Sequence, residues 1–89
     1  MAELKNIVGV NVRRRRVVAG MSQDALAAHL QTAGWDLSRA GLSKVEAGLR
    51  LVIDAEVVVL SKVLRCTPLD LLTGVNPKSV IGVVRQGRG

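Results

Sequence analysis

Few residues of this sequence could carry catalytic or metal chemistry. His29 is the only histidine and Cys66 the only cysteine, and they lie in different predicted helical neighbourhoods without the spacing of a zinc site. The carboxylates are scattered, with neither a glycine-rich phosphate loop nor a nucleophile motif beside them. We therefore expect no catalytic residues, no metal site and no enzymatic activity.

The cationic side chains are the more informative group. The sequence contains thirteen Lys and Arg and seven Asp and Glu, which gives a formal net charge of +6 and an isoelectric point near 10.8. Four of the cations are consecutive, at residues 13–16, and four consecutive helical residues spread around the whole helix, so at least one must approach the buried side. The charge balance favours a polyanionic partner such as nucleic acid.

One short segment could bring cations to such a partner. Ser38 is a good N-cap, Leu42 and Val45 form an apolar pair at helical spacing, and Gly48 is a stop signal. The outward face of this predicted helix then holds two cations among small residues: Arg39, Ala40, Ser43 and Lys44. Such a face attracts a nucleic-acid duplex and offers little steric obstacle to it.

The elements that must position this segment are also helical. Apolar periodicity, capping residues and glycine stops predict five helices, at about 4–19, 22–33, 38–47, 54–64 and 67–73. In the fourth, Asp54 is the expected cap and the β-branched run 57–59 competes for strand, but the spacing of Val57, Leu60, Ser61 and Leu64 favours helix.

Length and composition limit the architecture to one domain with a modest core. The chain has 89 residues, of which 48% are hydrophobic and 1% aromatic, so the core is aliphatic and a pocket for a large cofactor is disfavoured. We expect an all-α, compact five-helix domain at residues 1–74, with no cofactor, and a basic, valine-rich extension at 75–89. The apolar run 80–84 could be a strand, a subunit contact or a disordered end, and we favour the subunit contact because apolar segments seldom stay exposed.

Targeting features are not evident. The first five residues lack the plan of a signal peptide, the longest apolar run is Val57–Leu60, and a single cysteine suits a reducing compartment. We expect a cytoplasmic protein without a membrane partner.

The stretch from Val8 to Thr73, about three quarters of the chain, resembles the helix-turn-helix family of phage repressors, Cro proteins and xenobiotic-response-element-type regulators. The resemblance is carried, in order, by Arg16, by residues 21–27 (MSQDALA), by Ser38 with residues 42–48 (LSKVEAG), and by residues 60–64 (LSKVL) with Leu71 and Leu72. It implies a lambda-repressor-like fold whose third helix reads the major groove of double-stranded DNA.

The resemblance also implies roles for individual residues. Base-reading positions of the family match Arg39, Ala40 and Lys44, with Ser43 nearby. Phosphate-contacting positions match Ser22 and Gln23 at the start of the second helix, Ser38, and Arg50 in the loop past the third. Arg16 and Glu46 match a partly buried ion pair that ties the first helix to the recognition helix, so Arg16 is expected to serve architecture and not DNA.

Two departures from the family pattern bear on these roles. The link between the second and third helices, from Gln31 to Leu37, is longer than usual and contains Trp35, which either caps the core or approaches DNA or a partner. Ala40 and Gly41 stand where longer residues are common, so sequence preference rests on few contacts plus DNA shape.

The small size of the domain and the family resemblance predict its function and assembly. A domain this small needs a dimer on a palindromic operator for useful specificity, so we expect a homodimeric transcription regulator, a repressor more than an activator. The alternative is a protein-interaction module, such as an antitoxin or a coactivator-like domain, in which the 80–84 segment binds another protein.

Overall fold

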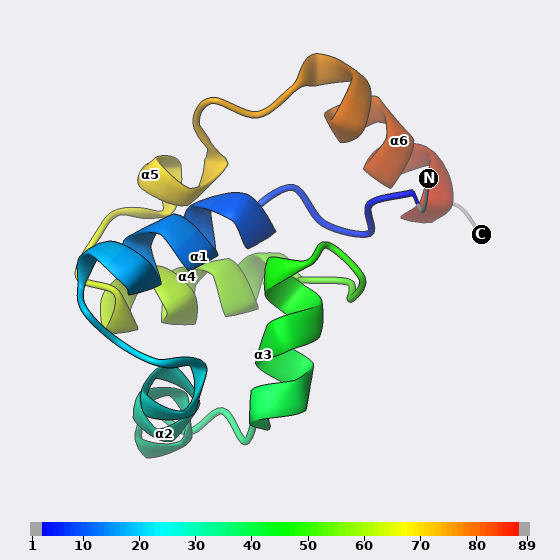
Figure 1. Cartoon of the computed structure of the whole chain (residues 1–89). Coiled ribbons are helices and arrows are strands. Elements are labelled where there is room, and N and C mark those ends of the chain that lie inside the picture. The colour runs from blue at the N-terminus through cyan, green and yellow to red at the C-terminus, as the bar shows by residue number, and fades with distance from the viewer. Residues whose placement is uncertain (1–2, 88–89) are drawn as a thin grey trace.

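The computed structural model describes residues 3–87, and α-helix is the regular secondary structure within that range (Figure 1). The expected all-helical fold is confirmed, with one helix more than the periodicity predicts. The helices are α1 (Gly9–Val18), α2 (Gln23–Thr32), α3 (Arg39–Glu46), α4 (Asp54–Val63), α5 (Pro68–Leu72) and α6 (Pro77–Gly87).

Three helices begin at the caps that the sequence predicts. The hydroxyl oxygens of Ser22, Ser38 and Thr67 accept hydrogen bonds from backbone N–H groups three residues on, at 3.0, 3.0 and 3.2 Å. In α5 the carboxylate of Asp70 also accepts from the Thr67 N–H at 2.8 Å, and this bond to the charged form lowers the pKa of Asp70. Local capping chemistry therefore fixes where α2, α3 and α5 start.

The predicted starts of two other helices are wrong. α1 begins at Gly9 and not near Leu4. The Oδ1 of Asn6 accepts from the Gly9 N–H at 2.8 Å, so a side chain, and not a preceding helical turn, satisfies this backbone donor. In α4, Ile53 and not Asp54 occupies the cap position, and the carboxylate of Glu56 accepts from the Ile53 N–H at 3.1 Å. In both cases a polar side chain satisfies a backbone donor that the apolar pattern does not reveal.

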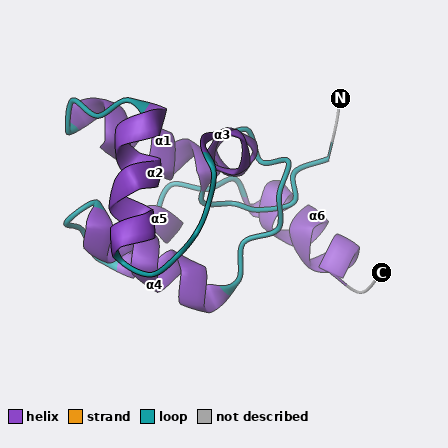
Figure 2. Cartoon of the chain, turned by 90° about the horizontal axis from the view of Figure 1, so that it is seen from below, coloured by secondary structure: helices purple, strands orange, loops and turns teal. Residues whose placement is uncertain are grey.

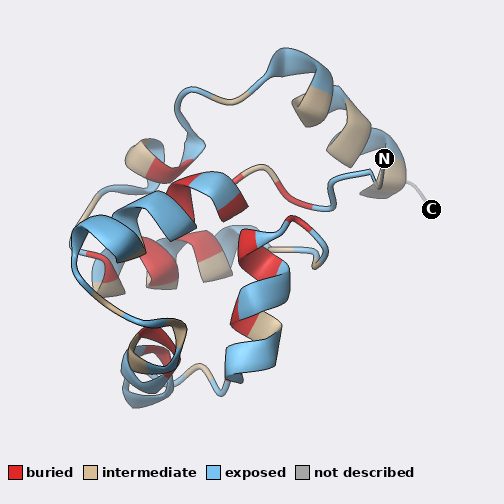
Figure 3. Ribbon diagram, viewed as in Figure 1, coloured by how far each residue is buried: buried red, intermediate tan, exposed pale blue. Residues whose placement is uncertain are grey.

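The core lies between α1, α2, α3, α4 and α5, and their buried sides face one another (Figure 3). The helices pack as the pairs α1 with α3, α2 with α3, α2 with α4, α4 with α5, and α1 with α5. The inward residues expected for α4 are confirmed as buried. Together the buried hydrophobic residues are Val8, Val12, Leu26, Ala27, Leu30, Leu37, Leu42, Val45, Val57, Leu60, Leu64 and Leu71.

The buried side chain of an asparagine on α1 joins α1 to the C-terminal end of α5. The Asn11 amide on α1 donates to the carbonyl oxygens of Leu71 and Thr73, both at 2.9 Å, and its Oδ1 accepts from Arg14. These bonds satisfy carbonyls at the C-terminal end of α5 that the helix itself leaves free. A polar residue inside the core thus locks α5 onto α1.

Within the extension beyond residue 74, Pro77–Gly87 form a helix, so the strand considered for residues 80–84 is wrong. Val80, Val83 and Val84 recur at helical spacing, and the Asn76 side chain accepts from the Lys78 N–H at 2.9 Å in the first turn. α6 lies to one side of the other helices, next to the N-terminal segment (Figures 1 and 2). None of the six helices described in residues 3–87 is long and apolar enough to cross a bilayer.

We predict that Gly9→Ala destabilises the protein although alanine favours helix. A Cβ at residue 9 would collide with the Val45 carbonyl oxygen and lie 2.9 Å from that of Glu46, so α1 must move away from α3. Overpacking typically costs about 1–3 kcal/mol, and we expect the upper part of that range because the clash is with backbone oxygens that cannot rotate away, which exceeds the ~1 kcal/mol that alanine gains in helix propensity.

The matched control is Gly82→Ala, because a Cβ there meets nothing within 4 Å and α6 gains helix propensity. Urea unfolding of both variants measures the difference. Equal midpoints for the two variants would show that the close approach of α1 and α3 does not matter.

Candidate nucleic-acid interface

The four predicted base-reading residues lie together on the exposed side of α3. Arg39, Ala40, Ser43 and Lys44 are all exposed, while Leu42 and Val45 on the opposite side are fully buried. α3 is therefore anchored from behind by two aliphatic side chains, and its outward face carries two cations separated by small residues.

The N-terminal turns of α2 and α3 lie side by side. Arg39 Nε is 3.8 Å from Asp24 Oδ1, and the side chains are 67% and 77% exposed. Exposed pairs of this kind contribute only about 0–1 kcal/mol, so Asp24 does not hold Arg39 away from a stronger partner. Two helix N-termini meeting at one surface also concentrate backbone N–H groups there, which favours phosphate.

The two serines expected to contact phosphate stand at these N-termini. Ser22 and Ser38 are exposed, and each hydroxyl oxygen accepts from a backbone N–H of its own helix. A hydroxyl that accepts still has its own hydrogen to donate. Capping the helix and donating to a phosphate oxygen are thus compatible at both positions.

Gly41 has a packing reason that its helix propensity conceals. A Cβ at this position would lie 2.6 Å from Leu37 Cδ1, and Leu37 is a buried core residue. The glycine allows the link between α2 and α3 to fold under the first turn of α3. A side chain at position 41 would therefore require Leu37 to move.

Arg16 and Glu46 form a bidentate ion pair beneath this surface. Arg16 Nε donates to Glu46 Oε2 at 2.6 Å and Nη2 to Oε1 at 3.0 Å, with side-chain exposures of 12% and 3%. Arg16 Nη1 also donates to the Met21 carbonyl at 2.9 Å. Hydrogen bonding to Glu46 raises the pKa of Arg16, and burial opposes that shift without reversing it. The cation from the arginine run that turns inward is thus Arg16.

Gln23 is a member of the same cluster. Its Nε2 donates to Glu46 Oε1 at 3.0 Å, so Glu46 holds residues of α1 and of α2 at once. Gln23 is only half exposed, and its expected contact with phosphate must be made while the amide is oriented by Glu46. That contact stays a prediction.

Arg50 is engaged inside the protein more than the sequence suggests. Its Nη1 and Nη2 donate to the two carboxylate oxygens of Glu56 at 3.1 and 3.2 Å, and Nη1 also donates to the Leu51 carbonyl. The guanidinium carbon lies 5.5 Å from the centre of the Trp35 ring. Trp35 packs against the core with this cation over its face, and a phosphate would have to share Arg50 with Glu56.

Sequence reasoning missed the residue that fixes the far end of α3. The Asn6 amide donates to the carbonyls of Val45 at 3.0 Å and Arg50 at 2.8 Å, while the Lys5 N–H donates to the Gly48 carbonyl at 2.7 Å. Gly48 has a φ of +74°, which favours glycine at this helix end. The only advance signal was an asparagine inside the run predicted as the first helix, and spacing does not reveal its distant partners.

The metal-ligating types of side chain are dispersed over the described part of the chain. In the region from residue 3 to residue 87, no three His, Cys, Asp or Glu side chains lie close enough to hold a metal ion. Cys66 is half-buried, and burial raises the pKa of its thiol, which lowers the fraction of reactive thiolate.

Comparison with known proteins establishes a shared fold. The chain superposes on the crystal structure of a hypothetical transcription factor from Neisseria with a TM-score of 0.66 and 24% sequence identity, over 91% of this chain and 92% of that one. No family model and no curated protein matches the sequence. The chain therefore shares the small all-helical fold of that hypothetical transcription factor.

We predict that Glu46→Ala destabilises the protein by about 3–5 kcal/mol, because Arg16 would remain mostly buried without its partner. Asp24→Ala is the control: it removes the carboxylate of the exposed pair with Arg39 and should cost less than about 1 kcal/mol. Chemical denaturation at neutral pH compares the two. Equal decreases in the free energy of unfolding for both variants would show that the buried pair stabilises the protein no more than the exposed pair does.

Proposed function

We propose that this chain binds double-stranded DNA sequence-specifically, inserts α3 into the major groove and regulates transcription, with no catalytic activity of its own. The observation that carries the proposal is the arrangement of α3: Arg39 and Lys44 are exposed, with Arg39 beside Asp24 in the first turn of α2, while Leu42 and Val45 are buried on the opposite side. This arrangement presents cations and little bulk to an approaching duplex.

The dimensions of α3 suit the major groove. An α-helix with its side chains is about 10–12 Å in diameter, and the groove is about 12 Å wide, so it admits one helix such as the eight-residue α3. Ala40 and Ser43 allow close approach, so the longer side chains on either side of them reach base edges. Arg39 is suited to guanine, because its planar fork matches O6 and N7.

Phosphates on either side of that groove would be met by Ser22, Gln23 and Ser38 at the two helix N-termini, and by Arg50 past the end of α3. The net charge of +6 adds a long-range attraction that does not depend on sequence. The similarity of fold to a hypothetical transcription factor from Neisseria supports the same conclusion.

Two base-reading cations per protomer provide limited discrimination, so we infer a homodimer on a palindromic operator with half-sites about one helical turn apart. The resemblance to phage repressors and Cro proteins favours repression over activation. Selection of bound duplexes from a random pool at a stated salt concentration tests the proposal, and a two-fold symmetric consensus is expected. Recovery of the pool without enrichment would reject it.

One observation favours a second candidate, an antitoxin or coactivator-like module that mainly binds protein. Val10, Val17 and Val18 on α1 are 58–80% exposed, and Arg13 and Arg14 stand beside them. Valines do not help to bind phosphate, whereas a protein surface could cover them. If the titrations below show only weak binding that is equal for every duplex, this candidate replaces the first.

We predict that Arg39→Ala loses about 1–3 kcal/mol of discrimination at one base pair of the selected site and binds random duplex nearly as well as wild type. Arg65→Ala, which removes the same charge from an exposed position after α4, should leave that discrimination intact. Fluorescence anisotropy with operator and single-substituted duplexes measures both. An Arg39→Ala protein that discriminates like wild type would reject the base-reading assignment.

We predict opposite effects from the two members of the Arg50–Glu56 pair. Arg50→Ala should weaken binding to every duplex alike and reduce the slope of log K against log salt by about one. Glu56→Gln should strengthen binding to every duplex, because it frees Arg50 while keeping an oxygen for the Ile53 N–H. If Glu56→Gln has no effect and Arg50→Ala changes only one base preference, Arg50 does not grip phosphate.

A further inference from the structure

α6 is an amphipathic helix with more apolar surface than its own protomer covers. At about 100° per residue, Val80, Ile81, Val83 and Val84 share one side, and Gly82 lies opposite them. Lys78 and Arg85 are on the polar side. No Asp or Glu occurs in residues 77–87.

Contact between α6 and its own body involves one edge of that apolar side. Val83 lines a cleft of the body, and Gln86 Nε2 donates to the Leu4 carbonyl at 2.7 Å. The other edge points away: Ile81 and Val84 are each 50% exposed. A helix with two such side chains in water has an apolar edge left to bury.

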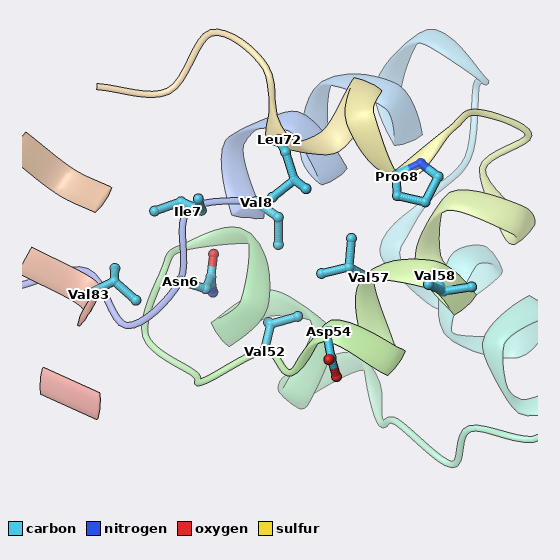
Figure 4. Close-up of a pocket in the computed structure, with 10 residues that line it drawn as sticks. All are labelled: Asn6, Ile7, Val8, Val52, Asp54, Val57, Val58, Pro68, Leu72 and Val83. Carbon is cyan, nitrogen blue, oxygen red and sulfur yellow. The ribbon is translucent and has the colours of Figure 1, made fainter. Parts of the chain in front are cut away.

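An open apolar cleft of about 390 Å³ lies beside α6 (Figure 4). The side chains of Val8, Val52, Val57 and Leu72 surround it, and Val83 approaches from the side of α6. The remaining lining residues are Asn6, Ile7, Asp54, Val58 and Pro68, so Asp54 supplies the one charged side chain of this apolar cleft.

We propose that α6 mediates dimerisation: while Val83 and Gln86 keep contacting their own body, the Ile81–Val84 edge of α6 enters the apolar cleft of a second copy, and the second copy does the same. An isologous arrangement of this kind makes each contact twice, so a short helix contributes two helix-in-cleft contacts to one interface. The aliphatic side chains of this edge thereby contact the aliphatic lining of the cleft, and the apolar edge of each α6 is buried.

Charge complementarity selects a second copy of this chain as the occupant. α6 carries cations and no acid among its described residues, and the cleft that would receive it carries the carboxylate of Asp54. Lys78 and Arg85 border the apolar face, so one of them can meet Asp54 of the other copy as the valines enter. An acidic partner helix would instead face Asp54 with like charge.

The proposed interface has a distinctive salt dependence. The overall repulsion between two copies with a net charge of +6 exceeds the attraction at the two Asp54 contacts, so added salt should strengthen the dimer by screening the net repulsion. DNA binding has the opposite dependence, because salt weakens contacts to phosphate. The inference rests on the proposed function only for the reason that a dimer is needed.

Sedimentation equilibrium of the full chain without DNA tests the proposal, with Ile81→Glu and Val84→Glu as variants and Gly82→Glu as the control. A carboxylate entering the apolar cleft should weaken dimerisation about a hundredfold or more, whereas the same charge on the opposite side of α6 should change it little. A wild type that is monomeric at every salt concentration, or Glu variants that dimerise like the control, would overturn the proposal.

Cross-linking identifies the cleft itself. In a Cys66→Ala background, Val58→Cys protein and Ile81→Cys protein are mixed and oxidised. A disulfide between the two different variants is expected to form faster than disulfides within either variant alone, and Gly82→Cys in place of Ile81→Cys should abolish that preference. Equal cross-linking of all combinations would place the interface elsewhere.

These outcomes are separate from those of the proposed function. A dimer with the predicted cross-link that shows no DNA preference would reject the regulator and keep the interface. A monomer that still selects a DNA sequence would reject the interface and keep the regulator.

Discussion

The arrangement of the first three helices depends on one buried carboxylate. Glu46, at the end of α3, accepts two hydrogen bonds from Arg16 on α1 and one from Gln23 on α2. Three helices thus meet at the Glu46 carboxylate, whose side chain is only 3% exposed. A carboxylate buried to this extent is tolerated only when a cation and hydrogen-bond donors surround it. The orientation of α3 relative to α2 follows from this junction.

Close packing and two backbone clamps extend that constraint along α3. Gly9 lets α1 approach the last turn of α3, and Asn6 ties the N-terminal segment to the carbonyls of Val45 and Arg50. At the other end, Gly41 accommodates Leu37. With its last turn and its first turn both fixed, α3 can present Arg39 and Lys44 in a defined direction, which base reading requires.

The parts of the fold that local rules govern were predictable. Ser22, Ser38 and Thr67 cap their helices within three residues, and buried faces follow from helical spacing, so these features are written in short stretches of sequence. Asn6 and Asn11 were not predictable, because their hydrogen-bond partners are about 40 to 60 residues away. α6 was missed because Gly82 and a valine-rich run weaken the helix signal, although Val80, Val83 and Val84 have helical spacing. For the candidate site, the exposed positions on α3 could be expected, whereas the engagement of Arg50 by Glu56 and Trp35 could not.

The central claim is that the outward face of α3 and the adjoining N-terminus of α2 meet the duplex. Nuclear magnetic resonance titration of the isotope-labelled chain with a duplex at low salt tests it most directly. The account predicts that the largest amide shift changes occur at Ser22, Gln23 and residues 38–44, with smaller ones near Arg50. Unchanged α3 amides, with the shifts concentrated on the exposed valines of α1 or on α6, would contradict it.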